Sequence, residues 1–266
     1  MHPAITAALA EDIGSGDITT LLTIPAGAMA VGVVQAKQAL RLAGVELLAD
    51  IFPCPVEVLR QSGDTLEPGD SIAIVRGPAR DLLTRERTAL NFLQRLSGIA
   101  TLTAQYVKAV EGTGCRILDT RKTTPGLRQL EKAAVAAGGG TNHRLGLYDR
   151  VLIKNNHIAA AGGVRAALER TRNAMVPVEI EVRTLQELDE ALTAGATHLL
   201  LDNLTPELAR QWIAHIAGRA TVELSGGITL GTVRAFAESG ADFISCGALT
   251  HSAPAVDINF TVELAV

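Results

Sequence analysis

VEIEVRTLQELDEALTAGATHLLLDNLTPELARQWIAHIAGRATVELSGGITLGTVRAFAESGADFISC, residues 178–246 of the chain, carries a regular repeat. Short apolar runs begin at residues 178, 198, 221 and 242, so the intervals are 20, 23 and 21 residues. One strand and one covering helix fill such an interval. Because most of the runs are continuous rather than alternating, they predict parallel strands covered on both faces. Two earlier β-rich runs, Arg116–Asp119 and Val151–Lys154, extend the series.

Helix start signals lie between the later runs. Thr184 and Glu187 form a capping box, Thr205 precedes Pro206, and Thr229 opens a further helical pattern. Repeated βα units form either a doubly wound sheet or a barrel. The polar residues at the strand ends, described below, favour the barrel.

The first part of the chain follows another pattern. Short β-like stretches, among them Val31–Ala36 and Ser71–Val75, surround a helical segment near Val45–Ile51, and turn signals separate them. They predict an antiparallel sheet with helices on it, an N-terminal α/β sandwich. A long helical pattern from Thr84 to Val110 follows, and we expect Gly98 to bend or interrupt it.

These patterns predict two domains. The sandwich is assigned residues 1–102, and the barrel is assigned residues 103–253. The run Asp257–Leu264 alternates as a strand does. We therefore expect the segment 254–266 to return to the sandwich.

Composition excludes several classes of function. The 266 residues carry a net charge of -4 and no long basic run, so nucleic acid and anionic membranes are not expected as partners. No apolar run approaches the roughly 20 residues that span a bilayer. The N-terminus lacks the pattern of a secretory signal. Cys54, Cys115 and Cys246 are far apart, which argues against disulfides and favours three small buried side chains. The sequence predicts a cytoplasmic protein.

Polar residues follow each predicted strand at the end that becomes the catalytic mouth of a βα barrel. In chain order they are Asp119, Thr120, Arg121 and Lys122, then Lys154, Glu179 and Glu181, Asp202 and Asn203, Ser225 with Gly226 and Gly227, and Gly247. Charged residues are rarely buried without partners. A ring that contains both signs predicts a site for a polyanion and a metal.

The carboxylates and glycines of this ring each permit two interpretations. Ser225-Gly226-Gly227 precedes a predicted helix, so its backbone N–H groups can bind a phosphate, although simple tight turns also explain such glycines. Glu181 and Asp202 provide the oxygen ligands that Mg²⁺ prefers. The alternative is an ion pair with Lys154 or Lys122. Glu179 shares the face of Glu181 but lies deeper, so we do not count it as a ligand.

Basic residues recur beside glycine-rich turns and strand ends. They are Arg87, Arg121, Lys122, His143, Arg144 and Lys154. For any one of them a solvated surface charge is a sufficient explanation, and a lone histidine is usually structural. Because guanidinium forks bind carboxylates bidentately and lysines supply compact charge, the whole set predicts anion recognition.

Motifs built around these residues run in one order through nearly the whole chain. They are Glu11–Thr19, Glu86–Asn91, Ile117–Leu127, Gly138–Leu147, Val151–Ile158, Leu201–Asn203, Ser225–Ile228 and Ser245–Ser252. Together they resemble the motifs of the quinolinate phosphoribosyltransferases. The combination is specific, although none of the glycine motifs alone is.

The resemblance implies a fold, a reaction and partners. The fold is an N-terminal α/β sandwich with an incomplete (β/α) barrel of the type II phosphoribosyltransferase kind. The reaction is a decarboxylating pentosyl transfer that converts quinolinate and phosphoribosyl pyrophosphate to nicotinate mononucleotide, pyrophosphate and CO₂, in de novo NAD biosynthesis and with Mg²⁺. A homodimer is implied in which the sandwich of one subunit helps to close the partner's barrel mouth; higher assembly is left open.

The resemblance also implies residue roles. Arg121, His143, Arg144 and Lys154 would hold the pyridine dicarboxylate, and Arg87 would be contributed across the dimer interface. Lys122, Glu181 and Asp202 would serve phosphoribosyl pyrophosphate and Mg²⁺, so that Lys122, Lys154, Glu181 and Asp202 are the expected catalytic residues. Ser225, Gly226 and Gly247 would bind the 5′-phosphate. One position departs from the family pattern, because Asn155 stands where Asp is usual.

Three alternatives are weighed against this interpretation. A barrel aldolase or isomerase would use Lys154 as a Schiff-base lysine but does not need the cluster of Arg121, His143 and Arg144. A carrier module is suggested by the turns between Gly63 and Gly77, which resemble lipoyl domains, yet no lysine stands at the hairpin tip. A molybdenum-associated paralogue has a similar architecture, and the intact basic cluster favours the quinolinate enzyme.

Overall fold

The computed structural model describes residues 2–265, which form two compact units. The first unit contains the chain up to residue 104, residues 124–139 and the chain from residue 252 onward. The second unit contains residues 105–123 and 140–251. Assigning all of 103–253 to the barrel was therefore wrong for residues 124–139, which include helix α5 (Arg128–Ala137). The reason is a buried ion pair: Glu131, 0% exposed, accepts from Arg95 at 2.9 Å.

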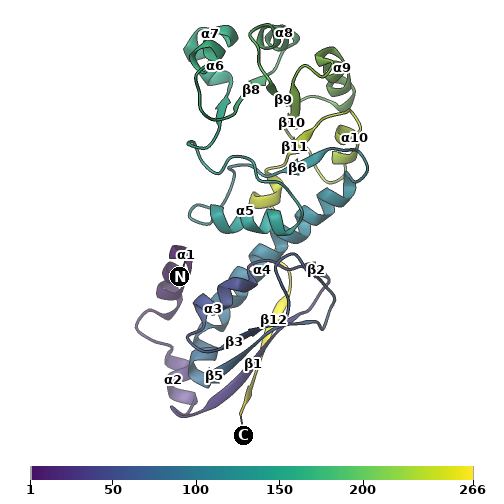
Figure 1. Cartoon of the computed structure of the whole chain (residues 1–266). Helices are drawn as coiled ribbons and strands as arrows, with labels where there is room; N and C mark the ends of the chain where they lie inside the picture. Colours follow the sequence, from purple (N-terminus) through teal and green to yellow (C-terminus); the bar gives the residue numbers. More distant parts are fainter. Residues whose placement is uncertain (1, 266) are drawn as a thin grey trace. The chain divides into compact units, whose positions relative to one another are not determined.

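The first unit contains an antiparallel sheet of order β12-β1-β5-β3 and a two-stranded sheet, β2-β4 (Figure 1). Its other elements are helical. The elements are α1 (Pro3–Ile13), α2 (Ile18–Thr23), β1 (Met29–Ala36), β2 (Leu40–Arg41), η1 (Val45–Leu47), α3 (Leu48–Ile51), β3 (Val56–Val58), β4 (Thr65–Leu66), β5 (Ser71–Pro78), α4 (Ala79–Ala109), α5 and β12 (Ile258–Leu264). An antiparallel sheet with helices confirms the predicted sandwich class.

The C-terminal strand β12 lies beside β1 in the sheet of the first unit. The pairing runs from Ala30 opposite Leu264 to Ala36 opposite Ile258. In β1, every second residue is buried, which is the alternation of a strand with one face on the core. The alternating run near the C-terminus is thus an edge strand of this sheet.

The long helix α4 is continuous through Gly98, so the expected interruption there was wrong. Glycine is required at this position for another reason. A Cβ on Gly98 would lie 3.0 Å from the carbonyl carbon of Pro254 and 3.2 Å from the Cα of Ala255. The absent side chain therefore lets the returning C-terminal segment contact the helix directly.

Helices α1 and α2 were not predicted. Pro3 stands at the start of α1, and the side chain of Asp17 caps α2 by accepting from the backbone N–H of Thr20 at 2.9 Å. Both signals are short and local, and in α2 the exposed residues Leu21 and Leu22 hide the amphipathic pattern.

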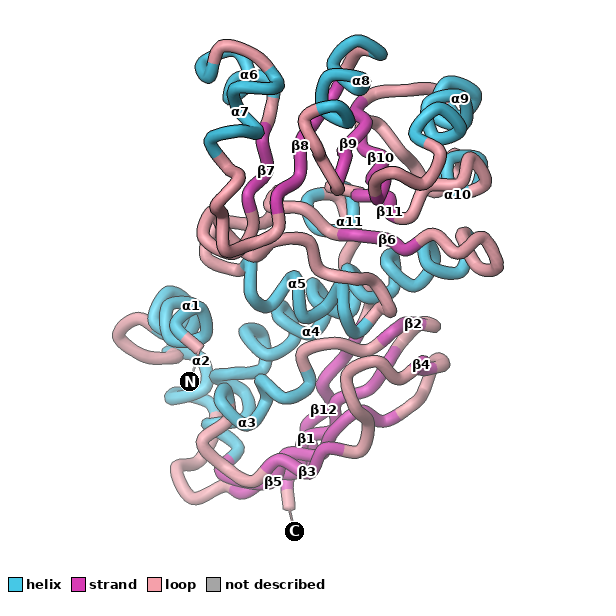
Figure 2. Tube along the Cα trace, turned by 45° about the horizontal axis from the view of Figure 1, so that its top comes forward, coloured by secondary structure: helices cyan, strands magenta, loops and turns pink. Residues whose placement is uncertain are grey.

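The second unit is built on a six-stranded, fully parallel sheet of order β6-β11-β10-β9-β8-β7. Helices α6 to α10 lie on the outer side of the strands (Figure 2). The elements are β6 (Arg116–Leu118), β7 (Val151–Ile153), α6 (Asn155–Ala161), α7 (Val164–Arg170), β8 (Val178–Val182), α8 (Leu185–Thr193), β9 (His198–Asp202), α9 (Pro206–Ile216), β10 (Thr221–Ser225), α10 (Val233–Ala237), β11 (Phe243–Ser245) and α11 (Ala248–His251).

This strand order is a ring with one pair missing. Strands β7 to β11 are neighbours in chain order, and β6 lies on the far side of β11. Only a pairing of β6 with β7 would close the ring, and the described residues contain none. The sheet is therefore the incomplete barrel that the resemblance implied, and its parallel strands are those that the repeat predicted.

The caps of the covering helices follow the sequence signals in two of three cases. Thr184 accepts from the backbone N–H of Glu187 at 3.1 Å, and Thr205 from that of Leu208 at 3.3 Å. The third helix, α10, begins at Val233 rather than at Thr229, because Thr229 and Thr232 bond to each other in a turn that precedes it. None of the helices in the described part of the chain has the length and hydropathy needed to cross a bilayer.

The cysteines are free, as predicted. Cys115 and Cys246 are buried, whereas Cys54 is partly exposed, so the expectation of three buried side chains was wrong for Cys54. Burial raises the pKa of both buried thiols to about 12. They are therefore protonated side chains of the core near neutral pH.

Candidate active site

A cavity of about 570 Å³ opens at the C-terminal ends of the six parallel strands, and all its residues belong to the second unit. Each strand contributes to it at its end or directly after it. The polar lining residues are Thr120, Arg121, Lys122, His143, Arg144, Lys154, Asn155, Glu181, Arg183, Asp202, Asn203, Glu223, Ser225, Gly226, Gly227 and Ser245. Five of them are Lys or Arg, so the cavity suits an anionic ligand.

Most of the predicted site residues line this one cavity. Those brought together are Arg121, Lys122, His143, Arg144, Lys154, Glu181, Asp202, Ser225 and Gly226. Gly247 is not a lining residue, but it lies against Lys122. Arg87 is exposed on α4 in the first unit and does not line the cavity.

Two guanidinium groups of the lining lie close enough to repel each other. Burial, and then the charge of Arg121, lower the pKa of Arg144. Arg144 is held by a hydrogen bond from Nη1 to the backbone carbonyl of Arg150 at 3.3 Å. Because like charges in a part-buried place disfavour each other, this pair is arranged for a multiply charged anion.

The cap of α6 fixes the position of Lys154. Lys154 is the N-cap residue, and its backbone N–H donates to Nδ1 of His157 at 2.9 Å. His157 thus satisfies the cap from within the helix, and the Lys154 side chain is left exposed where it lines the cavity. In the motif Lys154-Asn155-Asn156-His157, the lysine side chain therefore lines the cavity and the histidine side chain caps the helix.

Lys122 is positioned by Gly247, which follows β11, and by the short helix α11. Oγ1 of Thr250 donates to the backbone carbonyl of Lys122 at 2.7 Å. A Cβ on Gly247 would lie 2.9 Å from Cδ of Lys122, so glycine there leaves room for the lysine stem. Gly247 acts on the cavity through Lys122.

Glu181 and Asp202 lie on either side of one cation, Arg183. Nη2 of Arg183 is 2.7 Å from Oε1 of Glu181 and 3.6 Å from Oδ2 of Asp202, and Asn203 donates to the same Asp202 oxygen at 2.7 Å. The alternative of an ion pair with Lys154 or Lys122 was therefore wrong, because the cation that both acids contact is Arg183. Strand β8 aims Glu181 inward, whereas Arg183 follows the strand and can reach both acids.

These two acids fit a magnesium ion. Both offer carboxylate oxygens, the ligands that Mg²⁺ prefers. Oε1 of Glu181, on a side chain 5% exposed, accepts no hydrogen bond despite its ion pair. The guanidinium of Arg183, 48% exposed, stands where a cation is needed and can move outward.

The glycine loop after β10 lies very close to Asn203, the residue that follows β9. Gly226 and Gly227 both have positive φ, 100° and 61°. A Cβ on Gly226 would lie 2.7 Å from the backbone nitrogen of Asn203, which itself has a φ of 58° and donates from that nitrogen to the carbonyl of Ser225 at 2.9 Å. Since α10 begins six residues later and spans only five residues, the expected helix dipole does not reach this loop. Phosphate binding here depends on the loop backbone.

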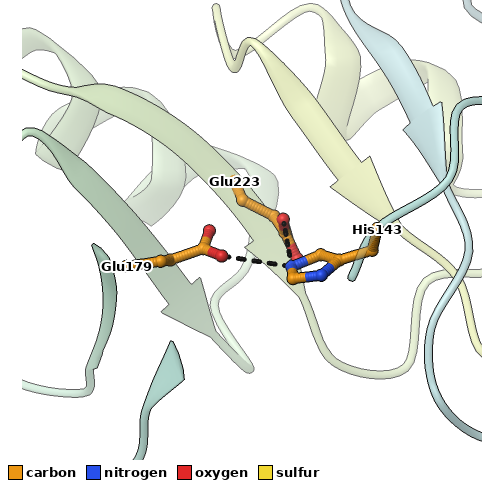
Figure 3. A group of neighbouring side chains, drawn as sticks. All are labelled: His143, Glu179 and Glu223. Carbon is orange, nitrogen blue, oxygen red and sulfur yellow. Dashed lines mark hydrogen bonds and ion pairs between the residues drawn. The ribbon is translucent and has the colours of Figure 1, made fainter. Parts of the chain in front are cut away.

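A buried cluster of one histidine and two glutamates lies in the middle of the strands (Figure 3). Nε2 of His143 is 3.1 Å from Oε2 of Glu179, on β8, and 3.3 Å from Oε2 of Glu223, on β10. Both carboxyl groups are 3% exposed. Burial lowers the pKa of His143, but the bonds to the two glutamates outweigh it and raise the pKa to about 9.

The proton on His143 is placed by a backbone contact. The N–H of Arg144 donates to Nδ1 of His143 at 2.6 Å, so that nitrogen is an acceptor and the ring hydrogen is on Nε2. The raised pKa favours a second proton, but this contact decides the resting state because two N–H groups cannot face each other at 2.6 Å. Nε2 then donates to a carboxylate and cannot also ligate a metal. The cluster is a hydrogen-bonded network.

Nearly the whole chain is similar to known proteins. Residues 17–97 match the family model of the quinolinate phosphoribosyl transferase N-terminal domain, and residues 99–261 match that of its C-terminal domain. The chain belongs to the quinolinate phosphoribosyltransferase family. A nicotinate-nucleotide pyrophosphorylase [carboxylating] of Mycobacterium leprae is 43% identical, covering 96% of this chain and 94% of the relative, and a probable one of Bacillus subtilis is 42% identical, covering 96% and 90%.

Solved structures of similar proteins also superpose on this chain. The crystal structure of NadC from Streptococcus pyogenes superposes with a TM-score of 0.94 at 40% identity, covering 99% of this chain and 96% of that one. The nicotinate-nucleotide pyrophosphorylase from Francisella tularensis gives 0.93 at 36% identity, covering 98% and 95%. Membership of this family disfavours the aldolase and carrier alternatives.

Three lining residues were missed by sequence reasoning: Arg183, Glu223 and Ser245. A signal existed for Glu223, because a charge inside an apolar strand run is unusual and its side chain must find a partner. Arg183 follows a strand directly and precedes the cap residue Thr184, which resembles any surface arginine. Asn155, where the resemblance implies Asp, also lines the cavity, so this residue is part of the lining itself.

Proposed function

We propose that the chain is a quinolinate phosphoribosyltransferase, nicotinate-nucleotide pyrophosphorylase (carboxylating). It transfers the phosphoribosyl group of phosphoribosyl pyrophosphate to the ring nitrogen of quinolinate and removes one carboxylate. The products are nicotinate mononucleotide, pyrophosphate and CO₂. Full-length similarity to proteins of that name supports the activity.

One observation carries the proposal at the level of the site. A single cavity contains four cations from three separate segments (Arg121, Lys122, Arg144 and Lys154), two acids that share a cation, and a glycine loop. A dicarboxylate, a sugar phosphate and a metal-bound pyrophosphate need these three features. A cavity for a neutral or cationic ligand would need none of the cationic set.

The cationic cluster positions the acid. We assign the two carboxylates of quinolinate to Arg121, Arg144 and Lys154, with His143 beside them, because guanidinium forks and an ammonium match carboxylates in charge and geometry. Binding in this way fixes the ring nitrogen as the nucleophile, and no side-chain nucleophile is needed. Orientation of the two reactants then contributes much of the rate.

The sugar phosphate is assigned to the opposite part of the cavity. Backbone N–H groups of Ser225 and Gly226 bind the 5′-phosphate, and Gly247 contributes by giving Lys122 its place. Glu181 and Asp202 would hold Mg²⁺, which when bound stabilises the negative charge of the leaving pyrophosphate. Lys122 adds its own positive charge to that group. Arg183, 48% exposed, would have to turn away from the two acids for them to hold the metal.

Bond formation and bond breaking follow from this placement. The ring nitrogen attacks the anomeric carbon as pyrophosphate departs, with an oxocarbenium-like transition state as in other glycosyl transfers. The nitrogen then carries positive charge. That charge stabilises the electron pair left on the adjacent ring carbon when CO₂ departs, and this carbon then takes up one proton to give the product.

The decisive experiment supplies the purified chain with quinolinate, phosphoribosyl pyrophosphate and Mg²⁺. We expect nicotinate mononucleotide, pyrophosphate and CO₂ in equal amounts. The Lys154→Ala variant should lose most of the turnover while its circular dichroism is unchanged, and Lys37→Ala, an exposed lysine of the first unit, should retain it. Near-normal turnover by folded Lys154→Ala contradicts the role of that lysine.

The homodimer and the role of Arg87 stay proposals from the resemblance. Arg87 is exposed, as a residue that serves a partner subunit must be. Mixing inactive Arg87→Ala with inactive Lys154→Ala chains should restore part of the activity if sites are shared between subunits. No recovery after proven subunit exchange contradicts sharing. The cytoplasmic location likewise stays a prediction.

A further inference from the structure

Arg183 directly follows strand β8 and lines the active-site cavity. The proposed chemistry requires of it only that it turn away from Glu181 and Asp202. Among the described residues, it is the cation that forms ion pairs with both of these acids. A positive side chain between two expected metal ligands competes with the metal, so the way in which Arg183 is held decides how the metal binds.

The backbone of Arg183 is fixed at the start of helix α8. Its N–H donates to Oε2 of Glu187 at 2.8 Å, and Thr184 accepts from the N–H of Glu187 at 3.1 Å. Because residues two apart on a strand point to the same side, the anchored Arg183 directs its side chain toward Glu181 and the cavity. A movement of the guanidinium is therefore a rotation of the side chain, and the turn between β8 and α8 stays in place.

The guanidinium is held by charge more than by directed hydrogen bonds. Both acids contact the same nitrogen, Nη2, at 2.7 Å from Oε1 of Glu181 and 3.6 Å from Oδ2 of Asp202. The first of these oxygens accepts no hydrogen bond. One nitrogen shared by two acids is not the bidentate geometry in which arginine binds a carboxylate most strongly. Since the Arg183 side chain is 48% exposed, water can hydrate the guanidinium when it moves.

The two acids, in contrast, need a cation at all times. Glu181 is 5% exposed, and the Asp202 side chain is 15% exposed. Carboxylates that are removed from water in this way require a compensating charge. Asn203 donates to Asp202 at 2.7 Å but brings no charge. The acids therefore hold either Arg183 or a metal ion in the space between them.

A second partner for the guanidinium arrives with the substrate. The proposed function assigns the metal to Glu181 and Asp202 and the pyrophosphate group to the metal, so phosphate oxygens lie near the two acids. Arg183 stays within their neighbourhood because its backbone is anchored beside Glu181. Guanidinium groups match phosphate oxygens in charge and geometry. Arg183 can thus exchange carboxylate contacts for phosphate contacts by rotating its side chain.

We propose, on the basis of the proposed function, that Arg183 is an exchangeable counter-ion that couples metal binding to the binding of phosphoribosyl pyrophosphate. In the empty cavity it neutralises Glu181 and Asp202 and keeps their affinity for divalent cations low. When phosphoribosyl pyrophosphate binds, Arg183 turns to a phosphate oxygen, and the two acids become available to the metal. The site therefore takes up metal together with its substrate and not before it.

The first test measures metal binding without any substrate. Mn²⁺, which takes the same oxygen ligands as Mg²⁺, is titrated into the metal-free chain, and unbound Mn²⁺ is counted by electron paramagnetic resonance. Arg183→Gln removes the competing charge and should bind Mn²⁺ about tenfold more tightly than wild type, within the usual range of coupling between two ligands. Arg165→Gln, an exposed arginine of α7 outside the cavity lining, is the matched control and should bind as wild type does.

A double variant shows whether the gain comes from the two acids. Glu181→Gln combined with Arg183→Gln should lose the tighter binding, because one of the two carboxylates is no longer charged. A gain that persists in the double variant places the Mn²⁺ elsewhere and contradicts the proposal. Unchanged or weaker Mn²⁺ binding by folded Arg183→Gln overturns the competition. If Arg183→Gln does not fold, Arg183→Met, which keeps an unbranched stem without the charge, is measured in its place.

The second test follows the substrate. At saturating Mg²⁺, Arg183→Gln should raise KM for phosphoribosyl pyrophosphate roughly tenfold and change kcat by less than about 3-fold, because a charge-assisted bond to the bound substrate is lost. One substitution then acts in opposite directions, on the metal and on the substrate, whereas a general loss of structure would weaken both. An unchanged KM contradicts the transfer of Arg183 to a phosphate oxygen.

Failure of the proposed function is recognised separately. A wild-type chain that forms no product from quinolinate, phosphoribosyl pyrophosphate and Mg²⁺ contradicts the proposed function and, with it, the coupling to this substrate. The Mn²⁺ titration needs no turnover, so it tests the competition between Arg183 and the metal in either case. An active wild-type chain whose Arg183→Gln variant has wild-type Mn²⁺ affinity contradicts the counter-ion exchange alone.

Discussion

Both ends of the parallel strands carry charged groups, but the two ends use them differently. At the N-terminal ends, charges are engaged within the protein: Arg150 lies 3.6 Å from Glu179, Arg116 stacks on Phe243 at 4.6 Å, and Asp242 accepts from a backbone N–H at 2.8 Å. At the C-terminal ends, Arg121 and Arg144 repel each other, and two acids share one exposed arginine.

This difference teaches how to recognise a site among charged barrel ends. Both ends carry charges of both signs. The difference lies in how far a charged group is already compensated by its protein neighbours, because a like-charge pair, or two acids that share one counter-ion, gains compensation when a ligand binds. At the C-terminal ends, the arginine pair and the two acids that share Arg183 are groups of this kind.

The largest expected effect is on kcat/KM for quinolinate. It is tested by replacing one arginine from each end of the strands. Arg144→Ala should lower kcat/KM for quinolinate by roughly 10²- to 10³-fold, since it removes a charge-assisted partner of the substrate. Arg116→Ala should change it by less than about 3-fold, because exposed contacts of this kind contribute little. Steady-state kinetics with varied quinolinate measures both. Equal losses would remove the distinction between the ends.

The next effect concerns the backbone of the binding loop. Gly226→Ala should lower the free energy of unfolding by about 2 kcal/mol more than Gly227→Ala, because only the first creates a collision, with Asn203, in addition to left-handed strain. Urea denaturation of both variants gives the difference. If the two variants are equally stable, the close approach to Asn203 does not require glycine.

A smaller effect concerns the two acids that share Arg183. Glu181→Gln should raise the Mg²⁺ concentration for half-maximal activity about tenfold, since one anionic oxygen ligand is lost. Asp242→Asn, at the opposite end, should leave it unchanged, because the amide oxygen can still accept from the backbone. Activity is titrated with MgCl₂ after chelation. An unchanged requirement in Glu181→Gln argues against Glu181 as a metal ligand.

The smallest effect uses the thiol that precedes β6. Burial, then the charge of Asp242, raises the pKa of Cys115 from 9.0 to about 12. Between these values the folded state keeps a proton that the unfolded state loses, so the contribution to stability is complete below pH 9 and falls as pH rises to 12. Its slope reaches at most about 1.4 kcal/mol per pH unit. Unfolding in reductant at pH 8 to 10.5 should show a shallower decline for Cys115→Ala; parallel declines contradict the raised pKa.

Much of the fold and of the candidate site could be predicted from the sequence. The features that could not be predicted have physical reasons. The 20-residue rhythm locates the parallel strands, because period and continuity depend on local packing. The placement of α5 in the first unit was not accessible, since it rests on contacts of Glu131 with Arg95. Residues at strand ends were found because a barrel directs them to one mouth. Glu223 was not, because only coordinates show that a buried strand residue reaches His143.

The seam between β1 and β12 has a consequence for synthesis on the ribosome. Residues 30–36 are synthesised long before their partners at 258–264. The first unit therefore cannot complete its sheet until residue 264 has been made, whereas the strands of the second unit, all between 116 and 245, are available earlier. Loss of β12 would leave β1 with an open edge, a surface prone to aggregation.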